Sequence, residues 1–123
     1  MPTEPQPVTL SQLVHRAVEV VDPDGVEEDL AELLRRFEDA DEPASALVDS
    51  LEQRMAETVG ILDPQEEVPA LQVASAVVVY LAHRRDEVSD DPDDILRLAV
   101  RAEFEGHPPA NVASWLQEVG VEY

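Results

Sequence analysis

The sequence predicts an all-α protein, folded as a compact bundle of five to six helices around a central, nearly all-apolar helix. Apolar residues recur along almost the whole chain with the spacing of an amphipathic helix, and no stretch alternates with the period of two that a strand requires. Turns rich in Asp, Pro and Gly separate the helical stretches. Because 123 residues suffice for one core, we expect a single domain over residues 9–123 behind a flexible N-terminal tail over residues 1–8.

The first three helices each carry one apolar stripe, and they are expected over residues 9–21, 25–40 and 43–62. A turn over residues 22–25 separates the first helix from the second, and Asp24 is predicted as the N-cap of the second. Pro43 is predicted as the first residue of the third helix, because proline is tolerated in the first turn. The Asp-Pro pair at residues 63–64 is expected to end that helix.

The fourth helix, expected over residues 69–85, is apolar nearly all round. A helix of this kind should be buried on every side, so it is either the central helix of the bundle or the seam of a homodimer. The second alternative makes five of its residues candidates for self-association. They are Val73, Val77, Val78, Tyr80 and Leu81.

The fifth helix is expected over residues 92–105, because Asp91 is a favourable N-cap and Pro92 suits the first helical position. A short sixth helix is expected over residues 110–119. Trp115, the sole tryptophan, has helical spacing with the apolar residues around it and is expected in the core or at an interface.

Charge is the most unusual property of the chain. Twenty-eight acids face eight arginines, with no lysine, and the net charge is −20. The composition resembles that of cytoplasmic proteins from halophiles, in which molar salt shortens the Debye length to about 3 Å and so reduces acidic self-repulsion. Direct binding to nucleic acid is disfavoured, since the phosphate backbone would repel such a surface.

Several classes of site are not expected. The chain has no cysteine, which excludes disulfides and thiol chemistry, and it has no glycine-rich phosphate loop or serine elbow. We therefore expect no cofactor and no catalytic residue. Because no segment is typical of a membrane span or a signal peptide, we expect a cytoplasmic location and no membrane partner.

Metal binding is weakly suggested by the histidines, each of which has a glutamate four residues away. The pairs are His15 with Glu19, His83 with Glu87, and His107 with Glu103. Such pairs arise by chance in so acidic a chain, and a metal site would need them to converge. The acidic turn over residues 89–94 lacks the ligand spacing of an EF-hand. We therefore expect no metal site.

The run His83-Arg84-Arg85 is a candidate anion-binding site, because adjacent arginines grip phosphate or carboxylate groups. The alternative is structural. Cations at the end of a helix complement its dipole, and Arg35-Arg36 lie in a comparable place late in the second helix.

Glu27, Glu28 and Glu32, with Glu87 and Asp90 later in the chain, resemble the carboxylate pattern of all-α nucleotide pyrophosphohydrolases of the MazG type. The resemblance implies a hydrolase whose glutamate-rich helices hold Mg²⁺ against a triphosphate. It covers a handful of residues, and the second motif falls where the fourth helix ends, so no site residue is carried over from the family.

Three functions from different classes follow from these patterns. The first is a non-enzymatic protein-interaction or regulatory module that self-associates as a homodimer and binds a protein partner. The second is an acidic decoy that mimics nucleic acid and occupies a DNA- or RNA-binding protein. The third is a Mg²⁺-dependent nucleotide hydrolase.

Overall fold

Six helices form the part of the chain described by the computed structural model, which covers residues 9–40, 42–43, 48–65, 67–83, 91–105 and 107–121. They are α1 (Leu10–Val21), α2 (Glu28–Phe37), α3 (Val48–Leu62), α4 (Pro69–His83), α5 (Pro92–Phe104) and α6 (Ala110–Glu118). The predicted all-α class is confirmed, and no β-strand occurs within these ranges. The tail predicted over residues 1–8 lies outside them.

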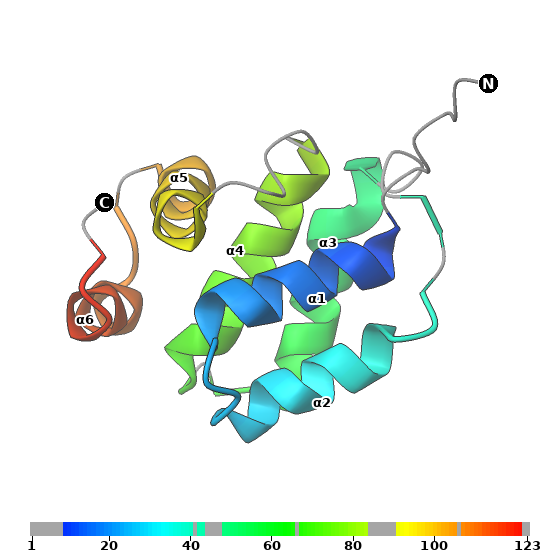
Figure 1. Cartoon of the computed structure of the whole chain (residues 1–123), viewed down its shortest axis with the longest axis horizontal. Helices are drawn as coiled ribbons and strands as arrows, with labels where there is room; N and C mark the ends of the chain where they lie inside the picture. Colours follow the sequence, from blue (N-terminus) through cyan, green and yellow to red (C-terminus); the bar gives the residue numbers. More distant parts are fainter. Residues whose placement is uncertain are drawn as a thin grey trace.

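Helix α4 is the centre of the bundle. It packs against all five other helices, with α5 and α6 on one side of it, α2 and α3 on the other, and α1 crossing it (Figure 1). Eleven of its 15 residues are buried. The expectation of a central, nearly all-apolar helix is thereby confirmed, and packing by its own chain is sufficient to explain why α4 is apolar all round.

The five candidates for self-association lie inside this core. Val73, Val77, Val78 and Leu81 are fully buried within the single chain, and Tyr80 is 8% exposed. All five belong to the core cluster of the single chain, and self-association through them stays a prediction. Of the two places considered for this helix, the bundle centre is therefore the one that α4 occupies.

Contacts with the chain beyond α2 complete the start of α1. Thr9 is the N-cap in a capping box, in which its hydroxyl accepts from the backbone N–H of Gln12 at 3.2 Å. The backbone N–H groups of Leu10 and Ser11, which have no partner within the helix, donate to carbonyl oxygens of residues 42 and 40. Pro43 forms an isolated β-bridge with Thr9, so the prediction that it begins α3 is wrong.

The turn between α1 and α2 is built around the buried carboxylate of Asp22. That carboxylate accepts hydrogen bonds from the backbone N–H groups of Val26 at 3.1 Å and Glu27 at 2.9 Å. Because these bonds hold residues 26 and 27 outside the helix, α2 begins only at Glu28. The predicted N-cap, Asp24, does not cap α2, and that prediction is wrong.

The turn between α3 and α4 repeats this arrangement. The buried carboxylate of Asp63 accepts from the backbone N–H groups of Glu67 at 2.9 Å and Val68 at 2.7 Å. In both turns an Asp-Pro pair ends a helix, and the aspartate binds the backbone four and five residues ahead. Asp22 and Asp63 are the two buried charged residues of the described chain, and their burial is offset by these charge-assisted bonds.

The start of α5 matches its prediction. Asp91 is the N-cap and accepts from the backbone N–H of Asp93 at 2.9 Å, and Pro92 opens the helix. The helix ends at Phe104, and its C-cap Glu105 has a left-handed backbone conformation with φ of 52°. None of the described helices has the length and apolar character needed to cross a membrane.

Replacing Val78 with glutamate should unfold the protein. The change places an unpaired carboxylate in the core, which we expect to lower the free energy of unfolding by about 4 kcal/mol or more. Ile61→Glu is the matched control, since Ile61 is 66% exposed and its replacement should cost less than about 0.5 kcal/mol. Urea unfolding followed by circular dichroism measures both. Light scattering gives the molar mass of both proteins. If the Val78→Glu variant kept native stability but had half the molar mass of the unchanged protein, α4 would be a dimer seam instead.

Replacing Asp63 with alanine should leave two backbone N–H groups without an acceptor. We expect a loss of about 1–3 kcal/mol in the free energy of unfolding, and a smaller loss for Asp63→Asn, whose amide oxygen still accepts. Asp39→Ala, at an exposed aspartate after α2, removes the same charge and should change stability by about 0.5 kcal/mol or less. If Asp63→Ala and Asp39→Ala changed the free energy of unfolding equally, the Asp63 carboxylate would not stabilise the turn as described.

Candidate functional site

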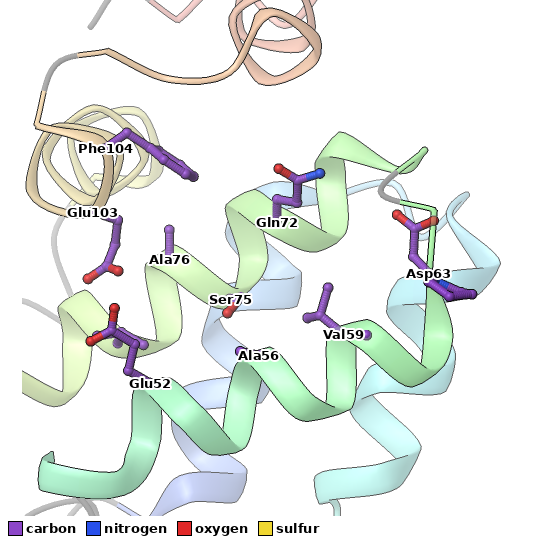
Figure 2. A pocket seen from close by; sticks show the side chains of 12 residues that line it. Glu52, Ala56, Val59, Asp63, Gln72, Ser75, Ala76, Glu103 and Phe104 are labelled. Carbon is purple, nitrogen blue, oxygen red and sulfur yellow. The ribbon is translucent and has the colours of Figure 1, made fainter.

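A groove between α3, α4 and the end of α5 is the candidate functional site (Figure 2). Its cavity volume is about 380 Å³, which is within the range of about 300–1,000 Å³ typical of ligand pockets. Helices α3, α4 and α5 and the turn between α3 and α4 contribute its lining residues, most of them small or apolar. They are Glu52, Ala56, Val59, Gly60, Asp63, Pro64, Gln72, Ser75, Ala76, Val79, Glu103 and Phe104.

Small residues at the α3–α4 contact explain why a hollow exists here. Ala56 and Gly60 of α3 line it together with Ser75 and Ala76 of α4, and none of these four carries a side chain long enough to fill the space. Leu51 and Met55, two large apolar residues of α3, are instead buried in the core. Because interiors are otherwise close-packed, a line of small residues between two helices leaves a groove.

Two carboxylates face each other at one end of the groove. Glu52 reaches up from α3 and Glu103 reaches down from α5, and their carboxylates point toward one another in Figure 2. Burial raises the pKa of Glu103, and the charge of Glu52 raises it further, while His83 acts in the opposite direction. Ionising Glu103 in the groove therefore costs free energy, and a positive charge placed beside it would lower that cost.

The rest of the groove offers neutral contacts. Val59, Val79 and Phe104 line it with apolar side chains, and Gln72 and Ser75 of α4 line it with uncharged polar side chains. Asp63 also borders the groove, but its carboxylate is engaged by the backbone N–H groups of the turn that follows. The groove is thus mostly apolar, with the two carboxylates of Glu52 and Glu103 at one end.

The glutamates of the hydrolase hypothesis lie elsewhere. Glu27 and Glu28 are exposed at the start of α2, and Glu32 forms ion pairs with Arg35 at 2.7 Å and Arg36 at 3.6 Å. Glu87 and Asp90 fall outside the described residues. Within the described ranges, no group of three or more His, Asp or Glu side chains is placed to hold a metal ion.

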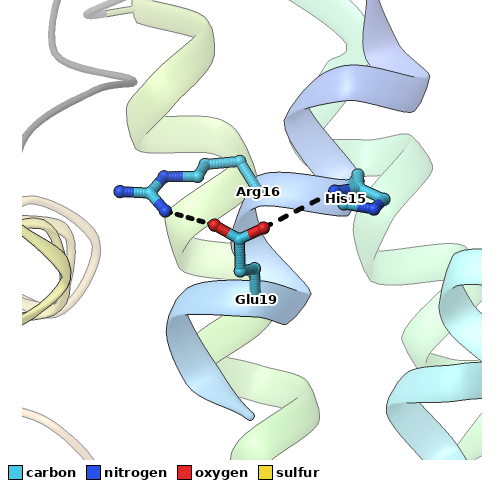
Figure 3. Close-up of polar contacts among 3 residues, drawn as sticks. All are labelled: His15, Arg16 and Glu19. Carbon is cyan, nitrogen blue, oxygen red and sulfur yellow. Dashed lines mark hydrogen bonds and ion pairs between the residues drawn. The ribbon is translucent and has the colours of Figure 1, made fainter. Parts of the chain in front are cut away.

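The histidine–glutamate pairs do not converge on a metal site within the described residues. His15 lies 4.0 Å from Glu19 on the outside of α1, and the same carboxylate binds Arg16 at 2.6 Å (Figure 3). His107 lies beyond the end of α5, because the chain leaves the helix at Glu105, so the helical spacing assumed for it with Glu103 does not apply. The partner proposed for His83, Glu87, is outside the described residues.

The predicted anion-binding run is described only at its first residue. His83 is exposed at the end of α4, near enough to Glu103 to affect its titration. Arg84 and Arg85 fall outside the described residues. Arg35 and Arg36, which occupy the comparable position late in α2, both form ion pairs with Glu32 of the same helix.

Sequence reasoning missed the facing carboxylates. Glu52 and Glu103 are far apart in the chain, and their meeting depends on how α5 crosses the bundle. The available signal was the run of small residues on α3 and α4, which marks where a groove forms but not what charge lies at its end.

Comparison of the chain with protein-family models, with curated proteins and with solved structures finds no match. No function therefore transfers from a relative, and the groove must be interpreted from its own residues.

Replacing Glu103 with glutamine should stabilise the protein at neutral pH. With a raised pKa, the native state keeps its proton to a higher pH than the unfolded chain does, so the cost of ionising Glu103 appears as pH rises above the ordinary value of 4.5. The advantage of the variant in denaturant midpoint should thus be present at pH 7 and absent below about pH 4.

Glu105→Gln is the matched control for this prediction. It removes the same charge at the same end of α5, so any effect of the helix dipole or of net charge is shared, but Glu105 is exposed. If the denaturant midpoints of the two variants differed by the same amount at every pH, or did not differ, burial would not be the cause of the raised pKa of Glu103.

Proposed function

We propose that this chain is a non-enzymatic interaction module that binds a segment of a partner protein in the groove between α3, α4 and α5. The observation that carries the proposal is the pair of facing carboxylates, Glu52 and Glu103, at the end of an apolar groove. Such a surface suits a segment that presents a basic side chain beside an apolar one.

Arginine is the basic residue that this geometry favours. Its planar guanidinium donates to two carboxylates at once, while its aliphatic stem packs on apolar surface such as Phe104 and Val79. A guanidinium between Glu52 and Glu103 would also remove the repulsion between the two acids, which adds to the favourable free energy of binding.

Binding of this kind is linked to pH. A bound cation favours ionised Glu103, so its pKa falls in the complex, and affinity should increase as pH rises through the raised pKa of the free protein. Self-association, also expected from the sequence, stays a prediction.

A short peptide with one arginine between leucines tests the proposal. Titrated into ¹⁵N-labelled protein, it should shift the amide resonances of α3, α4 and the end of α5. The same peptide with citrulline, which has the shape of arginine without its charge, should bind at least about tenfold more weakly, a loss of about 1.4 kcal/mol.

Two alanine variants provide the matched control. Ala56→Phe fills the groove and should abolish the shifts, whereas Ala31→Phe, at an exposed alanine of α2 outside the groove, should leave them unchanged. Equal affinity for the arginine and citrulline peptides, or equal binding to both variants, would show that the groove is not the binding site.

A further inference from the structure

A second groove lies at the other end of α5. It is formed by the end of α1, the α1–α2 turn, the start of α5, and α6, and its cavity volume is about 320 Å³. It shares no lining residue with the groove between α3 and α4. We refer to it below as the α6 groove.

Apolar side chains are exposed at the α6 groove. Val26 is 75% exposed, Val119 is 47% exposed, and both border the groove together with the half-buried Trp115. Of the three large apolar side chains that are strongly exposed in the described residues, these are two, and the third, Ile61, lies on α3 outside both grooves. A single exposed valine is ordinary, but two beside a tryptophan in one hollow form a patch typical of a binding surface.

The rim of the α6 groove is acidic. Asp24, Glu27 and Asp93 line it, and its lining residues include no arginine or histidine. Asp22 is present as well, but its carboxylate is engaged by the backbone of the turn. The charge complement of this surface is therefore a positive one placed around an apolar centre.

A second copy of this chain fits the surface poorly. In a two-fold dimer the same patch occurs on both partners, so the acidic rim would face itself, and each copy carries a net charge of −20. Like charges across an interface cost free energy. A partner with basic residues would instead gain favourable electrostatic free energy from the acidic rim.

We propose that the α6 groove is a second docking surface, which takes a basic amphipathic helix of a partner protein. The apolar face of that helix covers Val26, Trp115 and Val119, and its basic residues meet Asp24, Glu27 and Asp93. This is the mode in which an amphipathic helix places its apolar face in a groove. With the groove at the opposite end of α5, the protein then has two separate surfaces and can join two partners as an adaptor.

Trp115 is a built-in reporter for the test, since it is the only tryptophan in the chain. The probe is a synthetic helical peptide of leucine and lysine with leucines at positions i, i+3, i+4 and i+7, titrated into the full-length protein. Binding should shift the emission of Trp115 to shorter wavelength in a saturable manner. A peptide of the same composition in scrambled order should bind at least about tenfold more weakly, because it has no apolar face.

Matched variants locate the binding. Val26→Asp and Val119→Asp should each weaken the peptide by about tenfold or more, and Ile61→Asp, which adds the same charge at an equally exposed residue, should change affinity by less than about twofold. Glu27→Lys should weaken it more than Glu28→Lys, since Glu27 lines the groove and Glu28 does not.

Three results would overturn the proposal: equal binding of the scrambled peptide, equal loss in the Ile61→Asp control, or an emission shift that depends on protein concentration without peptide. The last would assign the groove to a second copy. None of these variants changes a residue that lines the groove between α3 and α4. A negative result with the leucine–lysine peptide can therefore be distinguished from a negative result with the arginine peptide at Glu52 and Glu103.

Discussion

The burial of α4 on every side is the constraint on which the rest of the structure depends. A helix that is apolar all round has no face to give to water, so five other helices must cover it. Covering it explains the amphipathic stripes of the outer helices and the tight turns between them. The groove between α3 and α4 occurs where small residues leave that cover thin, and the α6 groove lies beside the turn between α1 and α2.

The acidic composition is compatible with this core because, within the described chain, all charged residues except Asp22 and Asp63 lie outside it. The two buried aspartates of the described chain are exceptions with a structural purpose, since Asp22 and Asp63 each satisfy two backbone N–H groups at a helix end. Each of these turns also borders one of the two grooves. The same acids that close the bundle thus stand beside the surfaces proposed to bind basic partners, and screening by salt would weaken those contacts.

Much of the fold could be predicted, because periodicity, Asp-Pro pairs and the N-cap at Asp91 are local signals. The errors came where a contact that helix periodicity does not encode overrides a local signal for a helix start. Asp22 draws two backbone N–H groups away from the start of α2, and the bridge to Thr9 holds Pro43 out of α3. The candidate site could not be predicted for a related reason, since the meeting of Glu52 with Glu103 depends on how α5 crosses the bundle and leaves no local pattern.

Amide hydrogen exchange, measured at two protein concentrations that differ by about a hundredfold, tests the central claim most directly. If α4 is covered by its own chain, its amides should be the slowest to exchange, because they open only with the whole domain, and their rates should not depend on protein concentration. Protection of α4 that rises with protein concentration would mean that a second copy is needed to cover it. Exchange in α4 as fast as at the exposed end of α6 would contradict its place at the centre of the bundle.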